Sequence, residues 1–328
     1  MFKFIGRRLI YLIILLFAIS MLSFIIIQLP PGDFLDNQVS MMAESGNVLD
    51  QQQVEALRRM YGLDKPMIVQ YFMWISKIVF HGDFGMSLNW KTPVSTLIWG
   101  RLGWTLFISV LSLIFIWVFA IPIGIYSAVK QYSFLDYFFT FLSFMGLGIP
   151  PFLLALVVMW LAYRYFGFTV TGLFSNEYLL APWSWVKLMD FLKHLVVPVV
   201  VLGMGGTAGL IRVLRANLLD ELQKPYVVTS LAKGIKARKV ILKHPLRVAM
   251  NPFISTIGWT LPAIVSGSVI VGTVLNIPTV GPLLLDALMN QDMYLAGAIV
   301  FLLGFLTIVG TLISDILLAI LDPRIRIN

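Results

Sequence analysis

Apolar runs of about 20 residues or more recur along this chain of 328 residues, with polar connections between them. A helix of that length crosses the ~30 Å of hydrocarbon in a lipid bilayer. The composition agrees, since 59% of the residues are hydrophobic and only 12% are charged. Soluble domains contain roughly 25% charged residues, so this chain cannot cover itself with polar surface. We expect an all-α integral membrane protein.

Six of the runs are long enough to span the membrane. A polar stretch follows the first run and predicts a small domain outside the membrane. The predicted organisation is a short N-terminus with the first span (residues 1–29), this domain (30–100), and a five-helix core (101–328) that includes a basic segment (212–247). The six predicted spans are Leu9–Leu29, Thr105–Val129, Leu135–Tyr163, Leu195–Leu214, Leu246–Val274 and Tyr294–Leu321.

The distribution of charge predicts the side of the membrane that each polar segment faces. Residues 30–100 hold seven acidic and five basic residues, whereas residues 1–8, 212–247 and the tail after Leu321 are basic. Lys and Arg collect in loops that stay in the cytoplasm. We therefore expect a multi-pass protein with cytoplasmic N- and C-termini and an extracytoplasmic domain at 30–100. The same rule explains the pI near 9.6 without a nucleic-acid partner.

The basic segment at residues 212–247 is unusual in charge and in pattern. Its nine basic and two acidic residues give a net charge of +7, out of +8 for the whole chain. Val227, Leu231 and Ile235 recur at every fourth residue, which predicts a short helix with one apolar stripe. Two interpretations stay open: a docking element for a cytoplasmic partner, or a plain basic loop whose charge only sets the membrane orientation.

Proline and glycine predict where helices in this segment begin and end. Pro225 suits a first helical turn, because its missing N–H breaks no hydrogen bond there. Gly234 suits the left-handed residue that often follows a helix. Pro245 disfavours helical angles at His244, which predicts a second helix boundary.

Small and polar residues inside two of the spans are candidates for lining a hydrophilic pathway. Gly148 and Pro150 interrupt the third span, and Thr256, Thr260 and Ser266 lie in the fifth. Irregular backbone is tolerated in a membrane where it is buried in protein or faces a water-filled cavity. The alternative is that these small residues form surfaces for packing against other helices.

No catalytic or metal-binding constellation can be assembled from the sequence. The three histidines, His81, His194 and His244, lie in different polar connections, and the chain has no cysteine. No Gly-rich phosphate-binding sequence that ends in GK[ST] occurs, so we do not expect this chain to hydrolyse ATP. We therefore expect a non-enzymatic chain that holds neither a cofactor nor a metal.

Asp315 is the one acidic residue that lies well inside a predicted span. Intramembrane carboxylates are costly and often serve in proton or ion transport. Two interpretations stay open: an ion pair with Arg212 or Arg324 near the inner surface, or a proton relay in a transporter driven by an ion gradient. The second predicts several intramembrane acids and inverted repeats, and neither is evident in this sequence.

The run Tyr226-Val-Val-Thr-Ser-Leu-Ala-Lys-Gly234 resembles the EAA loop of ABC-importer permeases, in the branch that transports peptides. Val228-Thr229-Ser230 stands at the Glu-Ala-Ala position of that loop. Further stretches resemble the same branch, in the same order, along nearly the whole chain. They are Arg7-Arg8-Leu9 through Leu29-Pro30-Pro31-Gly32-Asp33, Tyr61-Gly-Leu-Asp-Lys-Pro66, Gly82-Asp-Phe-Gly85, Gly148-Ile-Pro150, Gly281 through Asp286-Ala287 and Asp292, and Leu321-Asp-Pro-Arg324.

The resemblance implies a fold similar to that of type I ABC-importer permeases. It also implies a coupling helix parallel to the membrane, at about Pro225–Gly234 and continuing toward Lys239, that seats in a groove on an ATPase. The residues that this resemblance assigns to ATPase coupling are Tyr226, Val227, Ser230, Leu231, Ala232, Lys233, Gly234 and Ile235.

The resemblance further implies the partners and the setting of the chain. Two ATPase subunits would bind ATP and Mg, an extracytoplasmic solute-binding protein would deliver the substrate, and a second, related permease chain would complete a heterodimer. The setting would be the cell (inner) membrane of a bacterium or archaeon, and the substrate a dipeptide or oligopeptide. Permeases of the same branch carry oligosaccharides or nickel, and these alternatives stay open.

Overall fold

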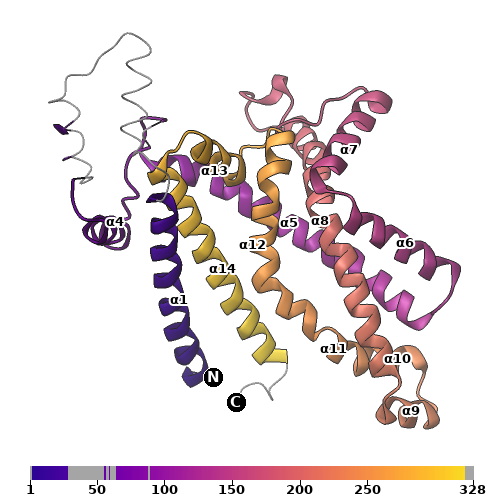
Figure 1. The fold of residues 1–328 in the computed structure, drawn as a ribbon. Coiled ribbons are helices and arrows are strands. Elements are labelled where there is room, and N and C mark those ends of the chain that lie inside the picture. The colour runs from indigo at the N-terminus through magenta and orange to yellow at the C-terminus, as the bar shows by residue number, and fades with distance from the viewer. Residues whose placement is uncertain (1, 29–54, 57–58, 60–63, 88, 322–328) are drawn as a thin grey trace. The chain divides into compact units, whose positions relative to one another are not determined.

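The computed structural model describes residues 2–28, 55–56, 59, 64–87 and 89–321 (Figure 1). Its elements are α1 (Phe2–Gln28), α4 (Met67–His81), α5 (Val94–Val129), α6 (Phe134–Gly148), α7 (Pro151–Phe166), a short 3₁₀ helix (Asn176–Tyr178), α8 (Trp185–Leu222), α9 (Pro225–Ala232), α10 (Ala237–Lys243), α11 (Pro245–Ala249), α12 (Asn251–Val274), α13 (Val280–Met289) and α14 (Met293–Leu321). For some residues of α1, α12 and α14 the description covers the backbone alone.

The chain divides into two compact units. The first comprises Met1–Ile5, Trp104–Pro282 and Leu306–Asn328, and the second comprises Gly6–Gly103 and Leu283–Phe305. The domain boundary predicted between residues 100 and 101 lies inside α5. The predicted extracytoplasmic domain falls in part outside the described residues, and the predicted division stays a prediction.

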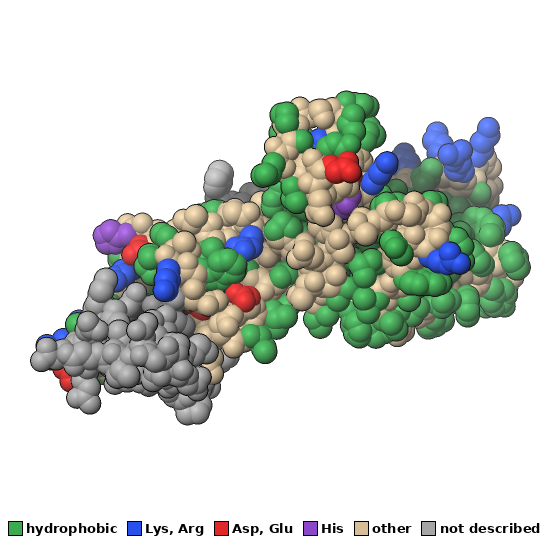
Figure 2. All heavy atoms as spheres, turned by 90° about the horizontal axis from the view of Figure 1, so that it is seen from above, with side chains coloured by type: hydrophobic (Ala, Val, Ile, Leu, Met, Phe, Trp, Pro, Cys, Tyr) green, Lys and Arg blue, Asp and Glu red, His purple; other side chains and the backbone are tan. Residues whose placement is uncertain are grey.

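Three helices in the described part of the chain are long and apolar enough to cross a membrane by themselves. They are Val94–Val129, Trp185–Leu222 and Tyr294–Ile320, and α6 and α7 would add a fourth span if they are counted together. Hydrophobic side chains spread over much of the face that Figure 2 shows, as expected for helices that lie in lipid. The fold is therefore that of an all-helical membrane protein, and the count of six spans stays a prediction.

The third predicted span, Leu135–Tyr163, consists of two helices instead of one kinked helix. α6 and α7 are bent by 108° relative to one another. Ile149 between them is extended (φ −87°, ψ 122°), because the residue before a proline avoids helical angles. Pro150 and Pro151 lack N–H groups, so the hydrogen bonding of α6 cannot continue, whereas Pro151 suits the first turn of α7.

The helix α8 is central to the first unit. It runs over 38 residues and is much longer than the predicted span Leu195–Leu214. It contacts α6, α7, α9, α11 and α12. Two of its glycines face α5, where a Cβ at Gly203 or Gly206 would lie 2.6 or 2.7 Å from the nearest side-chain atom. Small residues of this kind let membrane helices approach closely.

Asp292 joins the loop that precedes α5 to the start of α14 within the second unit. Its carboxylate is fully buried and accepts hydrogen bonds from the Ser87 hydroxyl (2.5 Å) and from the N–H groups of Asn89 (3.3 Å) and Leu295 (3.2 Å). A buried carboxylate is tolerated where donors of this kind surround it. The joint connects two stretches of the chain that lie more than 200 residues apart.

We expect the substitution Asp292→Asn to loosen this joint. The amide would turn an NH₂ group toward donors that now meet a carboxylate oxygen, and an unsatisfied buried polar group costs about 1–3 kcal/mol. Protease cleavage of the purified chain between α4 and α5 measures the effect. Asp286→Asn is the control, because Asp286 is half-buried and accepts one hydrogen bond from this loop, from the Trp90 indole (3.0 Å). If protease cleaved both variants at the same rate, Asp292 would not be the residue that holds this loop against α14.

Candidate functional site

The basic connection between α8 and α12 folds into α9, α10 and α11. Pro225 occupies the first turn of α9, as predicted. Gly234 has a φ of +75°, so the prediction of a left-handed residue that ends this helix is confirmed. His244 is not helical (φ −120°, ψ −66°) and α11 begins at Pro245, which confirms the second predicted boundary. Local chain chemistry thus sets the helix ends in this segment.

The helix α9 is shorter than the predicted coupling helix. It ends at Ala232, and α10 begins only at Ala237, so the helix does not continue toward Lys239. The left-handed angle at Gly234 turns the chain away from the axis of α9. As a result, α9 and α10 are two short helices that contact each other.

The predicted apolar stripe along one helix is wrong. Ile235 lies beyond the end of α9. Val227 is 1% exposed, whereas Leu231, four residues later, is 45% exposed. Val227 therefore anchors α9 on the protein, and Leu231 faces outward.

The exposed part of α9, α10 and the turn between them combines apolar side chains with cations. Val227 and Val240 anchor the two helices, with 1% and 2% exposed. Four large apolar side chains, each 41–58% exposed, form what we call the α9–α10 surface: Val228, Leu231, Ile235 and Leu242. Exposed cations in the same segment are Lys233, Lys236, Arg238, Lys239 and Lys243, and Arg247 is a sixth in the adjoining α11.

The eight residues predicted to act in coupling have different surroundings. Val227 is buried and lies outside the exposed surface. Ser230 is half-buried, and its hydroxyl donates a hydrogen bond to the backbone carbonyl of Tyr226 (2.7 Å). The exposed members of the set are Tyr226, Leu231, Ala232, Lys233, Gly234 and Ile235. A coupling role for all eight stays a prediction.

Glu221 is a residue of this site that the interpretation of the sequence missed. It is buried at the end of α8 and accepts hydrogen bonds from the Tyr226 hydroxyl (2.6 Å) and the Lys224 ammonium group. Burial, together with the hydrogen bond to the Glu221 carboxylate, raises the pKa of Tyr226 to about 12. Tyr226 therefore stays protonated and remains a donor near neutral pH. The available signal was that Glu221 is one of two acids among nine basic residues.

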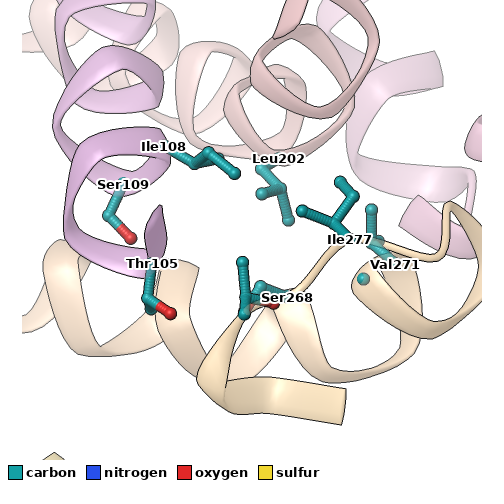
Figure 3. Close-up of a pocket in the computed structure, with 9 residues that line it drawn as sticks. Thr105, Ile108, Ser109, Leu202, Ser268, Val271 and Ile277 are labelled. Carbon is teal, nitrogen blue, oxygen red and sulfur yellow. The ribbon is translucent and has the colours of Figure 1, made fainter. Parts of the chain in front are cut away.

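A small pocket lies in the first unit between α5, α8, α12 and the loop after α12 (Figure 3). Its volume is about 10 Å³, close to the smallest cavity that holds one water molecule, so a peptide cannot enter it. The hydroxyl of Thr279 is buried there and has no hydrogen-bond partner among the described residues. The residues around the pocket include Thr105, Ser109, Leu202, Ser268, Val271 and Thr279.

The described members of the set predicted to line a pathway do not lie at this pocket. Gly148 and Pro150 are exposed at the break between α6 and α7. Thr256 is buried, and its hydroxyl donates to the backbone carbonyl of Phe253 (2.7 Å). The side chains of Thr260 and Ser266 lie outside the described residues. Of the three described residues, none lines the pocket, and the pathway role of all five stays a prediction.

Comparison with families of known proteins places the chain in one of them. Residues 1–109 match the N-terminal part of binding-protein-dependent transport system membrane components, and residues 120–327 match the binding-protein-dependent transport system inner membrane component. The chain belongs to this family. It is therefore a permease of the ABC-importer type, as the sequence motifs predicted. A transporter that works alone on an ion gradient is set aside.

Relatives of this permease cover nearly its whole length. It is 38% identical over 330 residues to the oligopeptide transport system permease protein AppB of Bacillus subtilis (strain 168), covering 99% of this chain and 100% of AppB. It is 30% identical over 342 residues to the dipeptide transport system permease protein DppB of Escherichia coli (strain K12), covering 99% of each. It is 27% identical over 321 residues to the nickel import system permease protein NikB of Staphylococcus aureus (strain USA300), covering 98% of this chain and 91% of NikB.

Proposed function

We propose that this permease forms, with a second and related permease chain, the pathway of an ATP-driven importer of dipeptides or oligopeptides. In this proposal the chain spans the membrane six times, with both termini in the cytoplasm and a small extracytoplasmic domain after α1. An extracytoplasmic solute-binding protein delivers the peptide. ATP and Mg are bound by two separate ATPase subunits, which move the permease through α9 and α10.

The observation that carries the coupling proposal is the exposed α9–α10 surface. Single exposed apolar residues are common on proteins. In this protein four exposed apolar residues lie close together in α9, α10 and the turn between them. Few residues of this segment are buried, and Val227 and Val240 are among them. An apolar group rimmed by charge is typical of a docking site. The six cations favour a cytoplasmic position and a partner groove with carboxylates at its edge.

The peptide cargo is supported by the relatives. The permease shares 38% and 30% identity with proteins named for oligopeptide and dipeptide transport. Nickel is the second candidate cargo, because a relative at 27% identity is named for nickel import.

Co-purification tests this function. We expect a tagged permease, expressed with the transporter subunits encoded beside it, to retain the ATPase subunits and to hydrolyse ATP faster when the binding protein is added. A permease that purifies without an ATPase would overturn the proposal. Binding of the same solute-binding protein to di- and oligopeptides, oligosaccharides and a nickel chelate then identifies the cargo, and selective nickel binding would exclude the peptide assignment.

A further inference from the structure

Two polar joints fasten neighbouring helices to the C-terminal half of α8. At the first, the buried carboxylate of Glu221 holds the Tyr226 hydroxyl of α9 at 2.6 Å. Its other oxygen accepts from the ammonium group of Lys224, the residue just before α9. Both carboxylate oxygens are therefore occupied by groups that belong to the start of α9.

The second joint connects α8 to α6. Asp136, in the first turn of α6, has a side chain that is only 3% exposed. Arg215 donates to it twice, from Nε to Oδ1 (3.0 Å) and from a terminal guanidinium nitrogen to Oδ2 (2.9 Å). The backbone N–H of Tyr132 adds a third hydrogen bond at 3.0 Å. A bidentate ion pair of this kind fixes the orientation of the guanidinium and carboxylate groups as well as the distance between them.

The two joints lie close together along one helix. Arg215 and Glu221 are six residues apart, or roughly 9 Å along the axis of α8. In each joint a buried carboxylate would lose its partners if the helices separated, and an unpaired buried charge is strongly unfavourable. Separation of α9 or α6 from α8 is therefore opposed at both positions.

We propose that Glu221 and Arg215 are positioning residues that make α9, α8 and α6 move as one body when a partner displaces α9. The inference rests on the proposed function, in which an ATPase is that partner. In this inference, the two polar joints on α8 transmit the movement of α9 to α6. The part that moves then extends to the break at Gly148 and Pro150, where α6 ends. A displacement at α9 thereby reaches residues that are candidates for the transport pathway.

The test uses the complete transporter, with its partner permease, ATPase subunits and binding protein, in lipid nanodiscs. In Glu221→Ala and Arg215→Lys we expect the ATPase to stay bound, while the stimulation of ATP hydrolysis by the binding protein falls about tenfold. Lys cannot reproduce the two-pronged contact of Arg215. Glu221→Gln, which keeps an acceptor for Tyr226, should fall between Glu221→Ala and the unaltered chain.

Matched controls lie on the same helix. Asp220→Ala and Arg212→Lys change exposed residues beside the two joints and should leave the stimulation unchanged. A loss of stimulation in the controls equal to that in the joint variants would overturn the inference. Unchanged stimulation in both joint variants would also overturn it. Absence of the ATPase from the unaltered transporter would instead overturn the proposed function, so the two failures are distinguishable.

A distance measurement tests the same inference without disturbing the joints. The chain has no cysteine, so spin labels can be placed at Thr229→Cys on α9 and Phe141→Cys on α6 alone. We expect the distance between the labels to be the same in the nucleotide-free and ATP-bound transporter, and to change with nucleotide once Arg215→Lys is added. A distance that changes with nucleotide while both joints are intact would overturn the inference.

Discussion

Replacing Leu231 by Asp is expected to abolish ATP-driven uptake while the permease still folds in the membrane. Leu231 is 45% exposed, so the new carboxylate stays hydrated in the free chain and folding is little affected. In an apolar groove of an ATPase the same carboxylate would lose its water without gaining a partner. Central apolar anchors of interfaces contribute about 2–4 kcal/mol, so we expect at least about 30-fold weaker association.

Retention of the ATPase on the tagged permease and peptide uptake by proteoliposomes measure this effect. Leu231→Met is the control for shape, because it conserves volume and apolar character. Gln223→Asp is the control for charge, since it adds the same carboxylate at an exposed site between α8 and α9 but outside the α9–α10 surface. Normal uptake by Leu231→Asp would show that this surface does not dock an ATPase.

The substitution Gly281→Ala is expected to destabilise the permease more than any other glycine replacement discussed above. A Cβ at Gly281 would lie 2.8 Å from both the backbone nitrogen and the Cα of Val269, and 3.1 Å from the carbonyl carbon of Ser268. These are backbone atoms of α12, so no side-chain rotation relieves the overlap. The start of α13 would have to move away from α12. Overpacking typically costs 1–3 kcal/mol, and we expect about 3 kcal/mol here.

The unfolding temperature of the purified permease in detergent measures this loss. Gly209→Ala is the matched control, because a Cβ at Gly209 meets nothing within 4 Å. In that helical position alanine is favoured over glycine by about 1 kcal/mol, so the unfolding temperature should stay the same or rise. Equal unfolding temperatures for Gly281→Ala and the unaltered chain would mean that Gly281 is not held against the backbone of Ser268 and Val269 as described.

Much of the helical architecture could be predicted from local sequence. The last predicted span, Tyr294–Leu321, coincides with α14 to within one residue, and the second ends where α5 ends, at Val129. Pro225, Gly234 and Pro245 mark helix boundaries where they were expected. These features are predictable because the length of an apolar run, a missing N–H and a left-handed angle act within a few residues of chain.

The surroundings of individual side chains could not be predicted in the same way. The periodic pattern treated Val227 and Leu231 alike, yet one is buried and the other exposed. In a chain this apolar, hydrophobicity identifies spans but does not tell a face that packs on protein from one that meets lipid or a partner. The hydrogen bond of the buried Glu221 carboxylate with Tyr226 and the ion pair of the buried Asp136 carboxylate with Arg215 follow from no periodic pattern in the sequence.

The sequence by itself determined the all-helical membrane class, the family, the basic segment and most helix boundaries, because these depend on composition, charge and short-range backbone preferences. Only the tertiary structure decided the 108° angle between α6 and α7, the burial of Val227 beside the exposed Leu231, and the joints of Arg215 with Asp136 and of Asp292 with Ser87. Each of these depends on which helices come together, and the Ser87–Asp292 contact bridges 205 residues of chain that no local pattern connects.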